Sequence, residues 1–346
     1  MKKTYKTRHI FLQVFILIFA VTFTSCIKDT DGSPETTAGN PSLESITPEE
    51  GSGGALVTIK GSGLGDIRSI VFDLNDVPAG VTPTLNTESS ILFRVPDTAF
   101  GGPQKIILTN SDGKTLEASF NVIALPIVSS AFPSDFQAGS TISLTGNNLD
   151  DVSSVVIDGT TDEATIVSQT RKSMVITMPA SSVISGKLKL TNVSGTLVTT
   201  KVFINIDQAA QVFTDAFNNG FESWSWGGTY ESSTDYSITG TSSLKAAFDA
   251  GGWGGLQLGN GGSLDVTGCK NFAFWVKGAA EDQNIQVIIN WANDWVPFTV
   301  PAEVWTYFSF DYATTWPGAG NSVNNVTFQI MGADKTVYFD NIVFIK

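Results

Sequence analysis

The sequence predicts an all-β protein made of consecutive sandwich domains. Its 346 residues are enough for two or three domains, each with its own core. Charged residues make up only 15% of the chain and it contains 33 glycines, a composition typical of short strands joined by tight turns. Apolar and polar residues alternate with a period of two, as in residues 56–60, where Val57 and Ile59 share one face. We therefore expect strands rather than helices along the chain.

The N-terminus has the pattern of a secretory leader. Basic residues up to Arg8 precede an apolar run from Ile10 to Phe23, which is shorter than most membrane-spanning helices. The run ends in Thr24-Ser25-Cys26, which resembles a bacterial lipobox. This resemblance implies that residues 1–25 are a signal peptide and that Cys26 is acylated, which would anchor the protein to a membrane. An ordinary secreted protein with a chance cysteine is the alternative.

Composition narrows the classes of function. Residues 26–40 are mostly small or polar, so we expect a flexible tether there. The acidic stretch from Lys28 to Asp31 resembles the surface-export signal of Bacteroidetes lipoproteins, which implies a location on the outside of the cell outer membrane. A solvated linker is the alternative. The net charge of −13 argues against a nucleic-acid partner, because phosphate backbones attract Lys and Arg clusters.

Two residue types limit the chemistry further. The single histidine, His9, lies in the leader, so the mature chain has neither a Ser-His or Cys-His pair nor a His-ligated zinc. Cys269 is the only cysteine besides Cys26, so we expect no intramolecular disulfide and a buried structural thiol.

A repeat of about 85 residues organises the next stretch. Gly61-Ser62-Gly63-Leu64 aligns with Gly146-Asn147-Asn148-Leu149, and Pro48 aligns with Pro133 at the same offset. A period of this length, with short strands between Gly and Pro, predicts two tandem sandwiches at 41–124 and 125–207. The motifs resemble IPT/TIG immunoglobulin-like domains, which implies a spacer or interaction module without catalytic residues.

The composition changes after residue 207. All eight tryptophans lie in 208–346, together with recurring strand-like runs. Seven or more short strands without a helical period predict a single jelly-roll sandwich. The runs are 255–258, 271–277, 285–291, 296–300, 306–310, 326–331 and 337–345.

Strand parity separates exposed tryptophans from core tryptophans. In residues 296–300 the apolar positions point inward, so Trp295 points outward. The same argument places several amides on the outward face of neighbouring strands, where they could bridge sugar hydroxyls while indoles stack on the apolar faces of sugar rings. The predicted glycan contacts are Trp253, Trp295, Trp316, Gln257, Gln286, Asn290 and Gln329.

The other tryptophans divide differently. Trp275 and Trp305 belong to apolar strands, so we expect them to pack in the core. Trp291 ends a strand on the inward parity and could serve either purpose. Trp224 and Trp226 lie in a loop, where exposed indoles are often functional, but Trp316 before Pro317-Gly318 is the better loop candidate.

Segments of this region resemble jelly-roll carbohydrate-binding modules, among them 221–224 and 338–342. The order of tether, IPT/TIG pair and glycan module resembles Bacteroidetes surface glycan-binding lipoproteins. That resemblance implies capture of a β-glucan, such as xyloglucan or mixed-linkage glucan, for a TonB-dependent importer and its lid lipoprotein. Glycan binding of this kind requires no cofactor. The resemblance also implies that Asp215 and Asp340 could supply carboxylates to a structural Ca²⁺, and an acidic turn is the alternative.

Two other functions remain open from the sequence. A glycoside hydrolase or lyase needs two carboxylates about 5–10 Å apart in a cleft, and the acids here fall mainly beside turns. A protein-binding adhesin or spacer could use the IPT/TIG pair. We expect a binding protein and not an enzyme.

Overall fold

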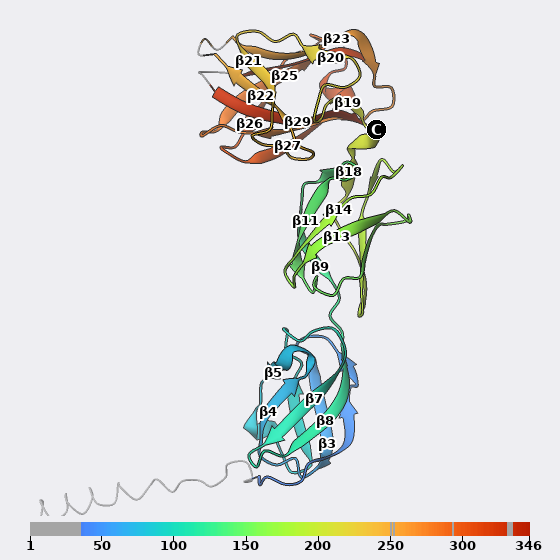
Figure 1. Ribbon diagram of the computed structural model, residues 1–346, viewed down its shortest axis with the longest axis vertical. Coiled ribbons are helices and arrows are strands. Elements are labelled where there is room, and N and C mark those ends of the chain that lie inside the picture. The colour runs from blue at the N-terminus through green and yellow to red at the C-terminus, as the bar shows by residue number, and fades with distance from the viewer. Residues whose placement is uncertain (1–35, 250, 252, 293, 331–334) are drawn as a thin grey trace, which may run out of the picture. The chain divides into compact units, whose positions relative to one another are not determined.

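The computed structural model describes residues 36–249, 251, 253–292, 294–330 and 335–346 (Figure 1). Short strands dominate these residues, so the protein is all-β, as the alternating pattern predicts. Contacts divide the chain into two units, one ending at Ile123 and one beginning at Ala124. The signal peptide, Cys26 and most of the expected tether lie outside the described residues.

The first unit is a sandwich of two sheets. Val57 and Ile59 are fully buried, as predicted, and pair across the smaller sheet with Phe93 and Ile91. The ring of Phe72 in the larger sheet lies 6.4 Å from that of Phe93, which joins the two layers. The smaller sheet has the order β1 (Ser42–Thr47), β3 (Leu56–Ser62), β6 (Ser90–Arg94), and the larger has the order β2 (Glu50–Gly51), β8 (Thr115–Val122), β7 (Gly102–Asn110), β4 (Ile67–Phe72), β5 (Val77–Ala79). Two 3₁₀ turns, η1 (Leu74–Asp76) and η2 (Pro83–Leu85), lie between β4 and β6.

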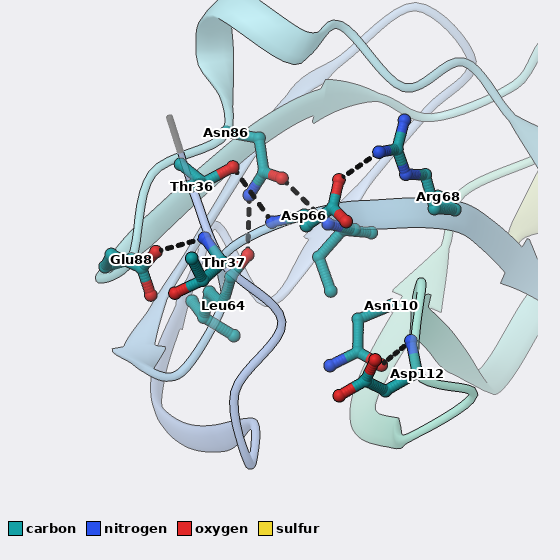
Figure 2. Close-up of polar contacts among 10 residues, drawn as sticks. Thr36, Thr37, Leu64, Asp66, Arg68, Asn86, Glu88, Asn110 and Asp112 are labelled. Carbon is teal, nitrogen blue, oxygen red and sulfur yellow. Dashed lines mark hydrogen bonds and ion pairs between the residues drawn. The ribbon is translucent and has the colours of Figure 1, made fainter. Parts of the chain in front are cut away.

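A buried asparagine fixes one end of this sandwich (Figure 2). The Oδ1 of Asn86 accepts the backbone N–H of Ile67 at 2.9 Å, and its Nδ2 donates to the carbonyl of Leu64 at 2.7 Å. The side chain thus satisfies backbone groups that the strands leave unpaired where β4 begins.

The last residues of the expected tether are held against the same end (Figure 2). The N–H of Thr37 donates to Glu88, and the hydroxyl of Thr36 accepts the N–H of Asp66. Gly65 allows this close approach, because a Cβ there would meet the carbonyl of Thr37. Residues 36–40 therefore pack on the first unit, and the expectation of a free tether up to residue 40 is too long.

The second unit begins with another immunoglobulin-like sandwich, whose core includes Phe136, Leu144 and Phe203. The repeated glycines Gly61 and Gly146 are explained by the same close contact in both sandwiches. At each position a Cβ would collide with a carbonyl oxygen of the neighbouring strand. The larger sheet has the order β17 (Gly195–Val198), β16 (Leu188–Asn192), β12 (Ser154–Ile157), β13 (Glu163–Gln169), β14 (Ser173–Thr177), β11 (Thr141–Asn147), β9 (Ile127–Phe132). The smaller has the order β10 (Asp135–Phe136), β18 (Phe203–Asn205), β15 (Ser185–Gly186), and the turn η3 (Ile206–Gln208) follows.

The rest of the second unit is a jelly-roll sandwich, drawn from yellow to red in Figure 1. The six-stranded sheet runs β21 (Gly228–Ser233), β22 (Ser243–Phe248), β29 (Lys335–Ile345), β24 (Asn271–Lys277), β27 (Trp305–Asp311), with β19 (Ala210–Phe213) pairing with β29. The five-stranded sheet runs β20 (Phe221–Ser223), β23 (Gly255–Asp265), β28 (Ser322–Ile330), β25 (Gln283–Ile289), β26 (Val296–Val300). The short helix α2 (Tyr312–Thr315) follows β27. Cys269 is a free, partly buried thiol, and its burial raises the pKa.

The outer face of the six-stranded sheet is partly covered by the preceding sandwich. Ile206 packs with Ala273 and Val343, and the ring of Phe132 lies 5.5 Å from that of Trp275. Trp275 is buried, as expected, but it faces away from the core of its own domain. The outer face of the five-stranded sheet lies on the opposite side of the sandwich.

Candidate functional site

The candidate site is the outer face of the five-stranded sheet. Leu256, Val287 and Phe328 are fully buried on its inner face, which agrees with the predicted parity. The strand register then aligns outward residues in two rows across the sheet. One row contains Gly255, Gln329, Gln286 and Pro297, and the other contains Gln257, Thr327 and Ile288.

Trp224 and Trp226 extend the edge of this sheet beyond β20. The N–H of Trp224 donates to the carbonyl of Gln257 at 2.9 Å, and Trp226 exchanges two backbone hydrogen bonds with Gly255. The hydroxyl of Ser225 accepts the N–H of Gln257, so the residue between the two tryptophans is also held against β23. The segment is an ordered strand edge and not a free loop.

Two glycines of β23 make room for these indoles. A Cβ on Gly255 would lie 2.4 Å from Cζ2 of Trp226, and a Cβ on Gly259 would overlap the ring of Trp224. The rings therefore lie flat against backbone that carries no side chain. Their N–H groups are engaged, since Nε1 of Trp224 donates to Glu222 and Nε1 of Trp226 donates to the carbonyl of Trp253.

The aromatic surface continues toward β25 and β26. The rings of Trp226 and Trp291 are stacked with centroids 6.3 Å apart, and Trp291 meets Trp295 edge to face at 5.8 Å. Trp291 is 52% exposed and Trp253 is 81% exposed, while Trp295 is half-buried. We call Trp224, Trp226, Trp253, Trp291 and Trp295 the aromatic face.

Amide side chains accompany the aromatic face. The Nε2 of Gln286 donates to Oε1 of Gln329 at 3.0 Å, which leaves further donors and acceptors on both amides. The described residues provide no hydrogen bond to the side-chain amide of Gln257, which is partly exposed. These three amides are thus placed to exchange hydrogen bonds with a bound polar ligand.

The structure brings five of the seven predicted contacts together on this face: Trp253, Trp295, Gln257, Gln286 and Gln329. Asn290 is at its edge, but its amide is fully occupied by backbone groups. The prediction for Trp316 is wrong. Its side chain is only 1% exposed and packs edge-on against Phe272 and Phe310 in the core. The short helix α2 folds it inward, which a loop-like sequence around Pro317-Gly318 does not reveal.

Trp224, Trp226 and Trp291 belong to the aromatic face but are not among the predicted glycan contacts. The sequence does contain one indication that Trp224 and Trp226 lie on this face. Residues two apart in an extended segment point the same way, and the outward positions Gly255 and Gly259 of the next strand leave space for large rings.

The two expected calcium ligands, Asp215 and Asp340, both accept hydrogen bonds from backbone N–H groups. Oδ1 of Asp215 accepts the N–H groups of Thr241 and Ser242, and the two oxygens of Asp340 accept those of Ile238 and Asn341. Calcium needs six to eight oxygens, and no group of three metal-binding side chains occurs among the described residues. The backbone N–H groups that both carboxylates accept fit the alternative of a hydrogen-bonded acidic turn, and the calcium site stays a prediction.

Burial dominates the electrostatics of Asp340. It raises the pKa of this carboxyl to about 8, despite the opposing effect of the two backbone donors. Burial likewise raises the pKa of Asp135 to about 6, and the N–H donors of Trp275 and Asn341 oppose the shift. Both carboxyls lie where the two sandwiches of the second unit meet.

The family model of the IPT/TIG domain matches residues 41–122 and, separately, residues 126–204. The chain carries two IPT/TIG domains. A comparison with curated protein sequences gives no match.

Several solved structures are similar to this chain. SGBP-B from a complex xyloglucan utilization locus in Bacteroides uniformis is 16% identical, over 89% of this chain and 100% of that one, with a TM-score of 0.47. The surface glycan-binding protein PbSGBP-B from Prevotella bryantii is 14% identical, over 90% and 99%, with a TM-score of 0.48. A mutant of a carbohydrate binding module family 29 is 21% identical, over 39% and 88%, with a TM-score of 0.29. At these values the similarity carries no argument about the ligand.

Among the described residues, no helix is long and apolar enough to cross a membrane.

Proposed function

We propose that this IPT/TIG protein binds a polysaccharide without cleaving it, and that the aromatic face is its binding site. One observation carries the proposal. Trp226, Trp291 and Trp295 form a continuous series of indoles across one sheet face, beside the amides of Gln257, Gln286 and Gln329. Indoles offer flat apolar platforms to sugar rings, and amides exchange hydrogen bonds with hydroxyls.

Exposure of the indoles supports the same reading. A soluble protein gains nothing from a cluster of exposed tryptophans unless something covers it. The ligand is proposed to be a neutral β-glucan, with xyloglucan and mixed-linkage glucan as the first candidates, because both follow from the sequence resemblance.

The experiment is affinity electrophoresis of the full chain in gels containing xyloglucan, mixed-linkage glucan, mannan, xylan or starch. Retardation by one of the β-glucans, reduced at least tenfold in affinity by Trp226→Ala (about 1.4 kcal/mol), is the expected result. Trp305→Ala is the matched control, since Trp305 belongs to the other sheet. Equal mobility of wild type and Trp226→Ala in every gel that retards the protein would remove the aromatic face from the site.

Absence of catalysis is a separate part of the proposal. Prolonged incubation of the full chain with the retarding glycan should release no new reducing ends. A release that grows with protein concentration would make the protein an enzyme and contradict this part.

Anchoring at the cell surface completes the proposed role. Acylation of Cys26 would hold the protein on the outer membrane, where it would pass glycan to a TonB-dependent importer and its lid lipoprotein. Cys26→Ser should move the protein from the membrane fraction to the soluble fraction, and protease added to whole cells should cleave the wild type. An unchanged fractionation of Cys26→Ser would refute the anchor.

A further inference from the structure

The turn after β25 has an unusual backbone. Asn290 and Trp291 are both left-handed, with φ of 53° and 51°. Asparagine adopts this conformation more readily than most residues, whereas a bulky side chain such as tryptophan rarely does. Such a conformation persists only where the surrounding structure enforces it, and it often marks a functional position.

The side chain of Asn290 supplies that enforcement. Its Nδ2 donates to the carbonyls of Ala319 and Ser322, at 2.8 and 2.9 Å. Its Oδ1 accepts the N–H groups of Asn324 and Asn325, at 2.9 and 3.2 Å. The backbone N–H of Asn290 also donates to the carbonyl of Asn325. One amide therefore ties the end of β25 to the start of β28 and to Ala319 in the turn before it.

This arrangement leaves the amide nothing to offer a sugar. A primary amide has two N–H donors and one oxygen with two lone pairs, and all four positions are taken by backbone groups. A direct hydrogen bond from Asn290 to a glycan, which the sequence suggests, would require breaking one of these bonds.

The residue that the turn presents is Trp291. Its exposed ring stacks on Trp226 from one side of the face and meets Trp295 from the other. Trp291 is thus the link between the indole at the β20 edge and the indole next to β26. Without the left-handed turn the chain would leave β25 in another direction, and this link would be lost.

We propose that Asn290 is a positioning residue for glycan binding, which acts only by holding Trp291 between Trp226 and Trp295. The proposal rests on the function proposed above for the aromatic face. It predicts that removing the Asn290 amide lowers the affinity for the glycan because Trp291 is displaced. Asn290 itself makes no contact with the glycan.

The test is a double-mutant cycle in the full chain, titrated calorimetrically with xyloglucan or mixed-linkage oligosaccharide, whichever polymer retards the wild type. Asn290→Ala and Trp291→Ala should each weaken binding about tenfold. The double variant should bind no more weakly than Trp291→Ala alone, because the two residues act as one unit. A double variant that loses a further tenfold would show that Asn290 touches the sugar itself and would overturn the proposal.

Asn192 provides a matched control. Its amide donates to the carbonyl of Ala124 and to Asp151, and accepts the N–H groups of Ser194 and Gly195. It is therefore an equally saturated asparagine in the other sandwich of the same unit. Asn192→Ala should leave the affinity for the glycan unchanged. If Asn192→Ala lowered the affinity as much as Asn290→Ala does, the effect of Asn290→Ala would be due to general destabilisation of the unit.

A spectroscopic readout separates this proposal from the function on which it rests. The stacked pair Trp226 and Trp291 should give a coupled indole signal in near-ultraviolet circular dichroism of the free protein. Asn290→Ala should abolish that signal as fully as Trp291→Ala does. Asn290→Asp, which keeps both accepted bonds, is the second variant if Asn290→Ala does not fold. A signal that survives in the Asn290 variant refutes positioning, whereas normal binding by the Trp226, Trp291 and Trp295 variants refutes the binding site.

Discussion

The indole N–H of Trp275 donates to the buried carboxyl of Asp135 at 2.8 Å, although 140 residues separate them in the chain. Asn341 donates to the same oxygen at 3.1 Å, and the other carboxyl oxygen is buried without a hydrogen-bond partner among the described residues. This contact joins the second IPT/TIG domain to the jelly-roll domain, and it depends on a group that is costly to bury.

Trp275→Phe tests how much the contact stabilises the second unit. Phenylalanine keeps an aromatic ring against Phe132 but removes the N–H donor, which leaves Asp135 with one partner fewer. We expect the free energy of unfolding to fall by about 1–3 kcal/mol, the usual cost of an unmade buried hydrogen bond. Calorimetry of the full chain measures this loss of stability, with Trp305→Phe as the control. Equal melting temperatures for wild type and Trp275→Phe would show that the hydrogen bond to Asp135 does not stabilise the second unit.

Stability should decline as the pH rises. Because burial places the pKa of Asp340 at about 8, above its unfolded value of about 4, the folded chain holds a proton that the unfolded chain has released. The stabilisation is complete below pH 4 and is lost as pH rises through 8. Melting temperatures from pH 5 to 8 should fall less steeply in Asp340→Asn, and the exposed Glu44→Gln is the control. Parallel slopes in all three proteins would disprove this origin.

Glycine at two outward positions should be required for binding. Gly255→Ala and Gly259→Ala each place a methyl group where an indole lies, so each should displace that ring and weaken glycan binding about tenfold, or 1.4 kcal/mol. Gly261→Ala in the same strand is the control, because a Cβ there meets nothing within 4 Å. Titration calorimetry compares the three, and equal affinities would mean that Trp224 and Trp226 do not need these flat positions.

Trp316 should contribute to stability and not to glycan binding, whereas Trp226 should contribute to glycan binding. Trp316→Ala removes a core side chain and should lower the free energy of unfolding by about 3–5 kcal/mol. Trp316→Phe should cost less, since it also removes an indole N–H that is buried without a partner among the described residues. Both should bind glycan normally while folded. Trp226→Ala should show the opposite pattern, and weaker binding by folded Trp316→Phe would return Trp316 to the site.

Strict alternation made much of the face predictable. In β26 the inward residues Phe298 and Val300 identify Trp295 as outward, and the same rule places Gln257 and Gln286. The predictions for Trp316 and Asn290 failed because they depend on contacts between residues that are far apart in the sequence. Trp316 is buried because helix α2 turns it toward Phe272, and the Asn290 amide is occupied because the chain returns 29 residues later with the carbonyl of Ala319. Periodicity carries no information about such returns.

The domain boundary expected between residues 207 and 208 falls inside a packed cluster. Ile204 and Ile206 on one side of it contact Ala273, Tyr307 and Val343 on the other. A recombination event that moved the jelly-roll domain alone would expose the apolar side chains of this cluster to solvent. It would also remove the hydrogen bond that Trp275 donates to Asp135. The second IPT/TIG domain and the jelly roll would therefore have to be inherited together.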